Sequence, residues 1–160
     1  MNIQQEHNLN IPQHFIDRVF MWNEERELLN KFDSELEYRL LKEEYDELLQ
    51  AEKDNDIHEQ LDAILDICVV FIGSCIKASL YKVNLQDTLA SYKTFESIVE
   101  TAFADITKLG YEPNCCFNET LLEIESRTGR IVNGKFSKWR EGDDEFTGNY
   151  KANYELCRLK

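Results

Sequence analysis

The sequence predicts an all-α fold, a bundle of about four to five helices built on an antiparallel helix hairpin. Apolar residues recur at helical spacing through most of the first 126 residues. Only 6 Gly and 2 Pro occur among 160 residues, which favours long helices and leaves few tight turns. The segment from Ile57 to Leu80 is apolar over most of its circumference, which is typical of a buried central helix. The length suits one domain, or one subunit of an intertwined oligomer.

The helical segments can be bounded by their apolar spacing and by capping residues. They are expected over about residues 13–30, 34–52, 57–80, 84–109 and 117–126. Asp33 or Ser34 can cap the second segment, and Asn84 or Asp87 the fourth. Gly110 suits the left-handed position that follows a helix end.

Both ends of the chain are predicted to differ from the helical body. Residues 1–12 are mostly polar and are expected to form an arm, with Pro12 at its boundary. After about residue 126 the helical pattern stops, and Asn133-Gly134 between β-favouring pairs indicates a hairpin turn. We therefore expect a short hairpin or an irregular arm over residues 127–160, within a single domain that spans residues 1–160.

The charge of the chain is strongly negative and unevenly distributed. The formal net charge is -13, which argues against non-specific binding to nucleic acid or to an anionic membrane surface. From Arg127 onward there are 8 basic and 5 acidic residues, whereas the rest holds 10 basic and 26 acidic residues. An acidic body with a basic tail suits a metal-binding body and an anion-handling tail, although a solvated surface would give the same counts.

The cysteines and the apolar segments favour a reducing, cytoplasmic setting. The five cysteines include no C-x-x-C pair, so we predict neither a disulfide framework nor a zinc site. Cys68 and Cys75 are seven residues apart and are expected on one buried face. The first residues lack a signal-peptide pattern, and the longest apolar run, broken by Asp66 and Lys77, is expected to be too short to span a bilayer.

Carboxylates accompany the predicted central helix. Glu44 and Glu47 are three residues apart on the second helical segment, and Glu59, Asp62 and Asp66 form one stripe of the third. In a tight hairpin centred near residues 54 and 55, Glu47 would lie opposite Asp62. A register shift of one residue would bring Glu44 level with Asp66.

Such a group of acids at the edge of an apolar helix needs a cation to offset its mutual repulsion. Carboxylate oxygens in this number suit Mg²⁺, or Mn²⁺. We therefore predict a metal site formed by Glu44, Glu47, Glu59, Asp62 and Asp66. Glu43 could reach a metal-bound water. The alternative is a solvated acidic seam without a ligand.

Two stretches, RLLKEEYDELLQA and HEQLDAILDICVVFIG, resemble the E-E-x-x-E and E-x-x-D region of the MazG-like all-α nucleoside triphosphate pyrophosphohydrolases. The segments LLEIESRTGRIVNGKFSK and YKANYELC are similar to the tails of phage-encoded members. Glu59 and Asp62 fit the E-x-x-D spacing, yet Asp66 better matches the Asp that directly precedes the apolar run. This departure leaves open which of the three are direct ligands.

The resemblance implies an enzyme with a nucleoside triphosphate as substrate, and the net charge predicts no nucleic-acid or membrane partner. It implies Mg²⁺-dependent hydrolysis between the α- and β-phosphates of a (deoxy)nucleoside triphosphate, with Glu43 and Glu44 as catalytic residues. It also implies a homodimer or homotetramer, in the host cytoplasm if the chain is phage-encoded. By position, the candidate substrate-binding residues are Trp22, Asn23, Arg127, Lys135, Lys138 and Lys151.

Two other classes compete with the enzyme. One is a helical adaptor whose acidic seam is solvated, and the other is an acidic mimic of nucleic acid. A metal site should raise the melting temperature in a saturable manner with Mg²⁺ or Mn²⁺, and neither competitor should.

Overall fold

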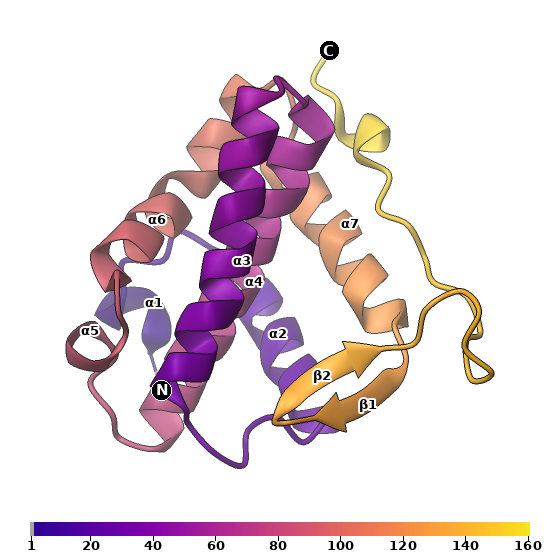
Figure 1. Cartoon of the computed structure of the whole chain (residues 1–160). Helices are drawn as coiled ribbons and strands as arrows, with labels where there is room; N and C mark the ends of the chain where they lie inside the picture. The colour runs from indigo at the N-terminus through magenta and orange to yellow at the C-terminus, as the bar shows by residue number, and fades with distance from the viewer. Residues whose placement is uncertain (1) are drawn as a thin grey trace.

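The computed structural model describes residues 2–160, and it confirms the all-α class with a short hairpin near the C-terminus (Figure 1). The helices and strands are α1 (Ile3–Glu6), α2 (Gln13–Glu25), α3 (Ser34–Lys53), α4 (Ile57–Leu80), α5 (Leu85–Thr88), α6 (Tyr92–Lys108), α7 (Pro113–Ser126), β1 (Gly129–Val132), β2 (Lys135–Lys138) and the short 3₁₀ helix η1 (Tyr154–Cys157).

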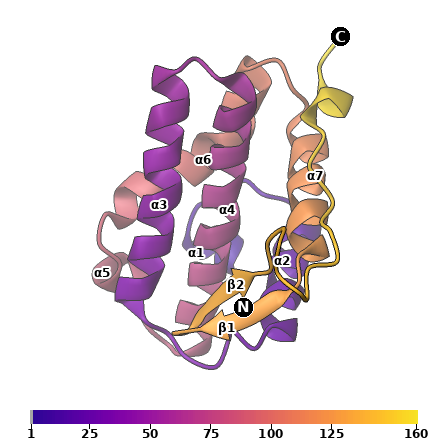
Figure 2. The same cartoon turned by 45° about the vertical axis from the view of Figure 1, so that its right-hand side comes forward.

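The long helices α3 and α4 form the predicted antiparallel hairpin (Figure 2). Near its turn, the Gln60 side chain donates to the Ala51 carbonyl at 3.4 Å. At the far end, the Ser74 hydroxyl donates to the buried Glu37 carboxylate at 2.7 Å. In each contact the two residues are equally far along the chain from a point between Asn55 and Asp56. This is about one residue later than the centre assumed from the sequence, so Glu44 lies level with Ile67, next to Asp66.

Helix α4 is the core of the fold. It packs against α2, α3, α6 and α7, and most of its residues are buried. At 24 residues it is long and apolar enough to cross a membrane, which corrects the expectation that it is too short. However, 72% of its apolar window is buried inside the protein, as in the central helix of a folded domain.

The first residues are not the polar arm that their composition suggested. Ile3, Leu9 and Ile11 are at most 5% exposed and belong to the hydrophobic core. The His7 ring also lies inside, 2.7 Å from the Tyr92 hydroxyl. Three apolar residues without a helical period were therefore enough to anchor this segment.

The fourth and fifth helical segments also differ in detail from the expectation. Asn84 caps the four-residue α5, and the chain then breaks at Ser91, whose φ of 60° is left-handed, before α6 begins. Helix α7 starts four residues earlier than expected because Pro113 occupies its first turn and Glu112 caps Cys115.

The predicted hairpin is confirmed as β1 and β2, with Val132 paired to Lys135 across the Asn133-Gly134 turn. Both turn residues have positive φ, 52° and 80°, as a two-residue hairpin turn requires. Phe136 of β2 packs edge-on against Trp22 of α2, with ring centroids 5.4 Å apart. This contact attaches the hairpin to the helical body.

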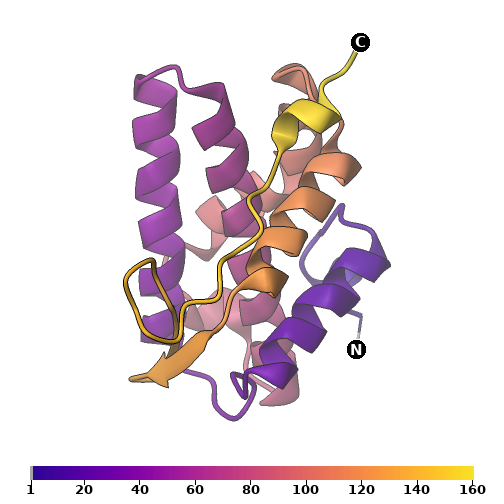
Figure 3. The ribbon, with the colours of Figure 1, turned by 90° about the vertical axis from the view of Figure 1, so that its right-hand side faces the viewer.

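After β2, the chain passes along α7 toward the turn of the α3–α4 hairpin (Figure 3). The amide of Ala152 donates to Glu123, and the amide of Asn153 donates to Glu119, both at 2.9 Å. Cys157 forms a disulfide with Cys115, which corrects the prediction that the cysteines form no disulfide framework. We call residues 139–160 the C-terminal arm.

Candidate active site

A group of carboxylates between α3 and α4 forms one half of the candidate site. Burial, with the negative charges of Glu47 and Asp62, raises the pKa of Glu44 to about 8. Burial and the charges of Asp62 and Glu44 raise the pKa of Asp66 well above its ordinary value. Three of the predicted residues, Glu44, Asp62 and Asp66, therefore lie close enough at the edge of the apolar helix for their charges to affect one another.

Asp62 connects these carboxylates to the C-terminal arm. Its Oδ1 accepts a hydrogen bond from the Tyr154 hydroxyl at 3.0 Å. Burial raises the pKa of Asp62, while the Tyr154 hydrogen bond opposes this rise and the charge of Glu123 adds to it. The negative charges that act most on Asp62 come from Glu123 and Glu59.

A cavity of about 460 Å³ opens beside Asp62, between α4, α7 and the C-terminal arm. Its charged lining consists of Glu59, Asp62, Glu123, Arg127, Lys138 and Lys151. His58, Asn149, Asn153 and Tyr154 add polar groups. The cavity therefore brings three carboxylates and three cations together, and Glu123 and Arg127 are paired with each other; a metal-bound phosphate chain requires groups of both charges.

Three of the four predicted tail cations line this cavity. Arg127 forms an ion pair with Glu123 at 2.7 Å, and both side chains are about one-fifth exposed. Burial and the neighbouring positive charges of Arg127 and Arg140 lower the pKa of Lys138. An anion in the cavity would relieve this repulsion between cations.

The fourth cation, Lys135, and two other predicted residues, Glu43 and Trp22, lie outside the cavity. Lys135 of β2 forms an ion pair with the exposed Glu43 of α3 at 3.4 Å. The Trp22 indole donates to the Ile124 carbonyl and stacks with Arg26, which lies 4.6 Å from its ring. None of Trp22, Lys135 and Glu43 lines the cavity.

Asn23 is part of the core. Its amide donates to the Val19 carbonyl at 2.9 Å within α2, and it packs closely on Gly73 of α4. Glu47 is exposed and does not line the cavity, although its charge acts on Glu44. Of the predicted substrate contacts, only Arg127, Lys138 and Lys151 therefore face the cavity.

Sequence reasoning missed Glu123 and Tyr154. Glu123 had a local signal, since it stands four residues before Arg127 on one helix, the spacing of an ion pair. Tyr154 is 92 residues from Asp62, and no pattern in the sequence connects them.

The donor set fits a divalent cation by its chemistry. Among the described residues, Glu44 Oε2 is the buried side-chain oxygen without a hydrogen-bond partner, and it lies among carboxylates whose pKa values are raised. Within residues 2–160, no three His, Cys, Asp or Glu side chains are close enough to form a metal cage. Carboxylate side chains would therefore have to rotate toward a bound ion.

An antiparallel helix pair that carries carboxylates, beside a cavity with charged walls, is the arrangement expected of an all-α nucleotide pyrophosphohydrolase. Residues 21–94 match the family model of phosphoribosyl-ATP pyrophosphohydrolase. That family belongs to the MazG-like, all-α nucleoside triphosphate pyrophosphohydrolase superfamily, to which the sequence pattern also pointed. The match supports hydrolysis of an acid anhydride bond in a nucleotide substrate.

No curated protein and no solved structure matches the chain. The matched segment runs from the end of α2 to the start of α6 and contains all five predicted metal ligands. Helix α7, the hairpin and the C-terminal arm lie outside it. The cationic side of the cavity is thus formed by a part of the chain that the family model does not describe.

Proposed function

We propose that the protein hydrolyses (deoxy)nucleoside triphosphates to the monophosphate and pyrophosphate, with Mg²⁺ as the cofactor and Mn²⁺ as a substitute. The observation that carries this proposal is the cavity beside Asp62, which is lined by Glu59, Asp62 and Glu123 together with Arg127, Lys138 and Lys151. A metal ion would offset the repulsion among the carboxylates, and a phosphate chain would offset the repulsion among the cations.

The residues that would hold the cation are Glu44, Glu47, Glu59, Asp62 and Asp66, since carboxylate oxygens are the ligands that Mg²⁺ prefers. A bound Mg²⁺ would polarise the phosphate oxygens, activate a water molecule and offset the developing negative charge. Rotation of the half-buried Glu44 and Asp66 side chains would bring their oxygens toward it.

The chain's own residues would bind and orient the substrate. Arg127, Lys138 and Lys151 would donate hydrogen bonds to the phosphate oxygens and fix the α-phosphate next to the carboxylates. Water attacks the α-phosphorus, the bond from this phosphorus to the bridging oxygen breaks, and pyrophosphate leaves. Glu44 is the carboxylate that we expect to accept the proton of the attacking water, because its buried Oε2 has no partner in the protein.

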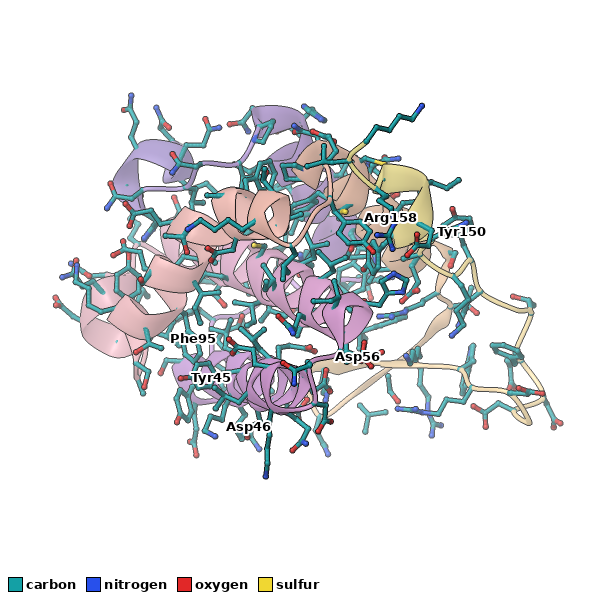
Figure 4. All side chains as sticks on the ribbon, turned by 90° about the horizontal axis from the view of Figure 1, so that it is seen from above. Tyr45, Asp46, Asp56, Phe95, Tyr150 and Arg158 are labelled. Atoms are coloured by element: carbon teal, nitrogen blue, oxygen red, sulfur yellow. A yellow bond between two sulfur atoms is a disulfide. The ribbon has the colours of Figure 1, made fainter. Side chains whose placement is uncertain are left out.

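The test is pyrophosphate release from a panel of ribo- and deoxyribonucleoside triphosphates, with phosphoribosyl-ATP included, at several Mg²⁺ concentrations. The Glu44→Gln and Asp66→Asn variants should lose the activity and keep the fold. Asp46→Asn is the matched control, since Asp46 lies on the outer side of the same helix and pairs with Lys42 (Figure 4).

Full turnover in both Glu44→Gln and Asp66→Asn would contradict the assignment of the carboxylates. Preferred hydrolysis of phosphoribosyl-ATP would contradict the proposed nucleoside triphosphate substrate, whereas the proposed reaction class would stand.

A further inference from the structure

Tyr154 of the C-terminal arm reaches into the candidate active site. Its side chain is buried, with 6% exposed, and its hydroxyl lies 3.0 Å from Asp62 Oδ1 and 2.8 Å from Thr120 Oγ1. It also lines the cavity beside Asp62. One phenol oxygen thus joins α4, α7 and the arm at a single point.

The directions of these two hydrogen bonds follow from the groups involved. An ionised carboxylate only accepts hydrogen bonds, so the Tyr154 hydroxyl donates its one hydrogen to Asp62. Thr120 must then donate to the Tyr154 oxygen. The resulting order, from Thr120 to Tyr154 to Asp62, engages Oδ1 and leaves Oδ2 of Asp62 as the oxygen that can serve a ligand in the cavity.

The position of Tyr154 is itself fixed from both sides along the chain. On one side, the Asn153 amide donates to Glu119 at 2.9 Å. On the other, Cys157 is joined to Cys115 by the disulfide, and its carbonyl accepts from the Glu112 amide at 2.8 Å. A tyrosine held this firmly can fix the orientation of the carboxylate that it contacts.

We propose that Tyr154 is a positioning residue that orients the Asp62 carboxylate for metal binding and catalysis. This inference rests on the proposed function, in which Asp62 is a metal ligand. It assigns a role in the site to the C-terminal arm, which lies beyond the segment matched by the family. Groups that orient metal ligands typically contribute about 10- to 100-fold to metal affinity or activity.

The experiment compares Tyr154→Phe with Tyr150→Phe. Both substitutions remove a phenol hydroxyl from the same arm, and the Tyr150 hydroxyl donates to Glu119, outside the cavity lining (Figure 4). Tyr154→Phe should lower kcat about 10-fold or more and weaken Mn²⁺ binding, followed by electron paramagnetic resonance, by a similar factor. The KM for the nucleotide should stay within about twofold, because the phenol makes no proposed phosphate contact. Tyr150→Phe should behave as the wild type in all three measurements.

Thr120→Val provides a second variant that keeps the phenol ring and its packing. It should produce a smaller loss of kcat and of Mn²⁺ affinity in the same direction. If Tyr154→Phe and Tyr150→Phe lose activity equally, the C-terminal arm acts only through stability, and the proposal is overturned. The proposal is likewise overturned if Tyr154→Phe binds Mn²⁺ and turns over as the wild type does, whereas the proposed function then stands.

A wild-type protein that releases no pyrophosphate from any nucleotide would contradict the proposed function instead. In that case the Mn²⁺ titration still decides the role of Tyr154, since it does not depend on turnover.

Discussion

Removal of the disulfide between Cys115 and Cys157 should lower the free energy of unfolding by about 4 kcal/mol. The two cysteines are 42 residues apart, and a cross-link that closes a loop of this length restricts the unfolded chain by about that amount in the chain-entropy description. Cys157→Ala is the preferred change, because Cys157 is 3% exposed and a serine hydroxyl there would add a separate cost of burial.

The assay is urea denaturation of the wild type and of Cys157→Ala, each with and without a thiol reductant. The oxidised wild type should have the highest midpoint, and reductant should lower it to that of the variant. The variant itself should not respond to reductant, since its remaining thiols are not cross-linked. Cys116→Ala, which removes a buried cysteine outside the disulfide, should still respond to reductant as the wild type does.

A thiol titration in urea provides the independent check. The oxidised wild type should show three reactive thiols, from Cys68, Cys75 and Cys116. Five reactive thiols, together with a midpoint that does not change on reduction, would refute the cross-link and the reasoning built on it.

The remaining predictions concern charged groups in the site and the core. Glu44 has a pKa of about 8 in the folded, metal-free protein and an ordinary value of 4.5 when unfolded, so the folded state holds the proton more tightly. Stability without metal should therefore fall as the pH rises from 4.5 to about 8, and Glu44→Gln should flatten this fall in urea melts with EDTA. Lys138→Ala should raise the KM for the nucleotide about 10-fold in steady-state kinetics, because a charged hydrogen bond is lost, whereas Lys135→Ala should not. Lys77→Ala should lower the free energy of unfolding by about 3–5 kcal/mol in denaturant, because it leaves the buried Glu37 carboxylate without its ion-pair partner.

Features set by local periodicity could be predicted from the sequence. The apolar circumference of α4, the acidic stripe beside it and the Asn133-Gly134 turn each depend on neighbours within a few residues. The α3–α4 hairpin follows as well, since a short polar break between two long helices leaves them antiparallel. Glu44 was expected level with Asp66 after a one-residue register shift, and it lies level with Ile67, the next residue.

Features that join distant parts of the chain could not be predicted. Spacing alone does not pair Cys115 with Cys157 among five cysteines, and nothing local connects Tyr154 to Asp62. The burial of Ile3 also escaped prediction, because a single apolar residue in a polar segment has no period to detect. Tertiary packing decides each of these contacts.

The ion pair of Glu37 with Lys77, and the Glu37 bond to Ser74, hold one end of the α3–α4 hairpin, while the turn holds the other. Helices fixed at both ends cannot slide past each other without breaking a buried ion pair. The spacing between their backbones is therefore preset before any ligand arrives. A metal ion should be accommodated by side-chain torsions alone, so amide exchange in the two helices should slow without a change in its pattern along the chain. Loading would then require side-chain rotation without a rearrangement of the fold.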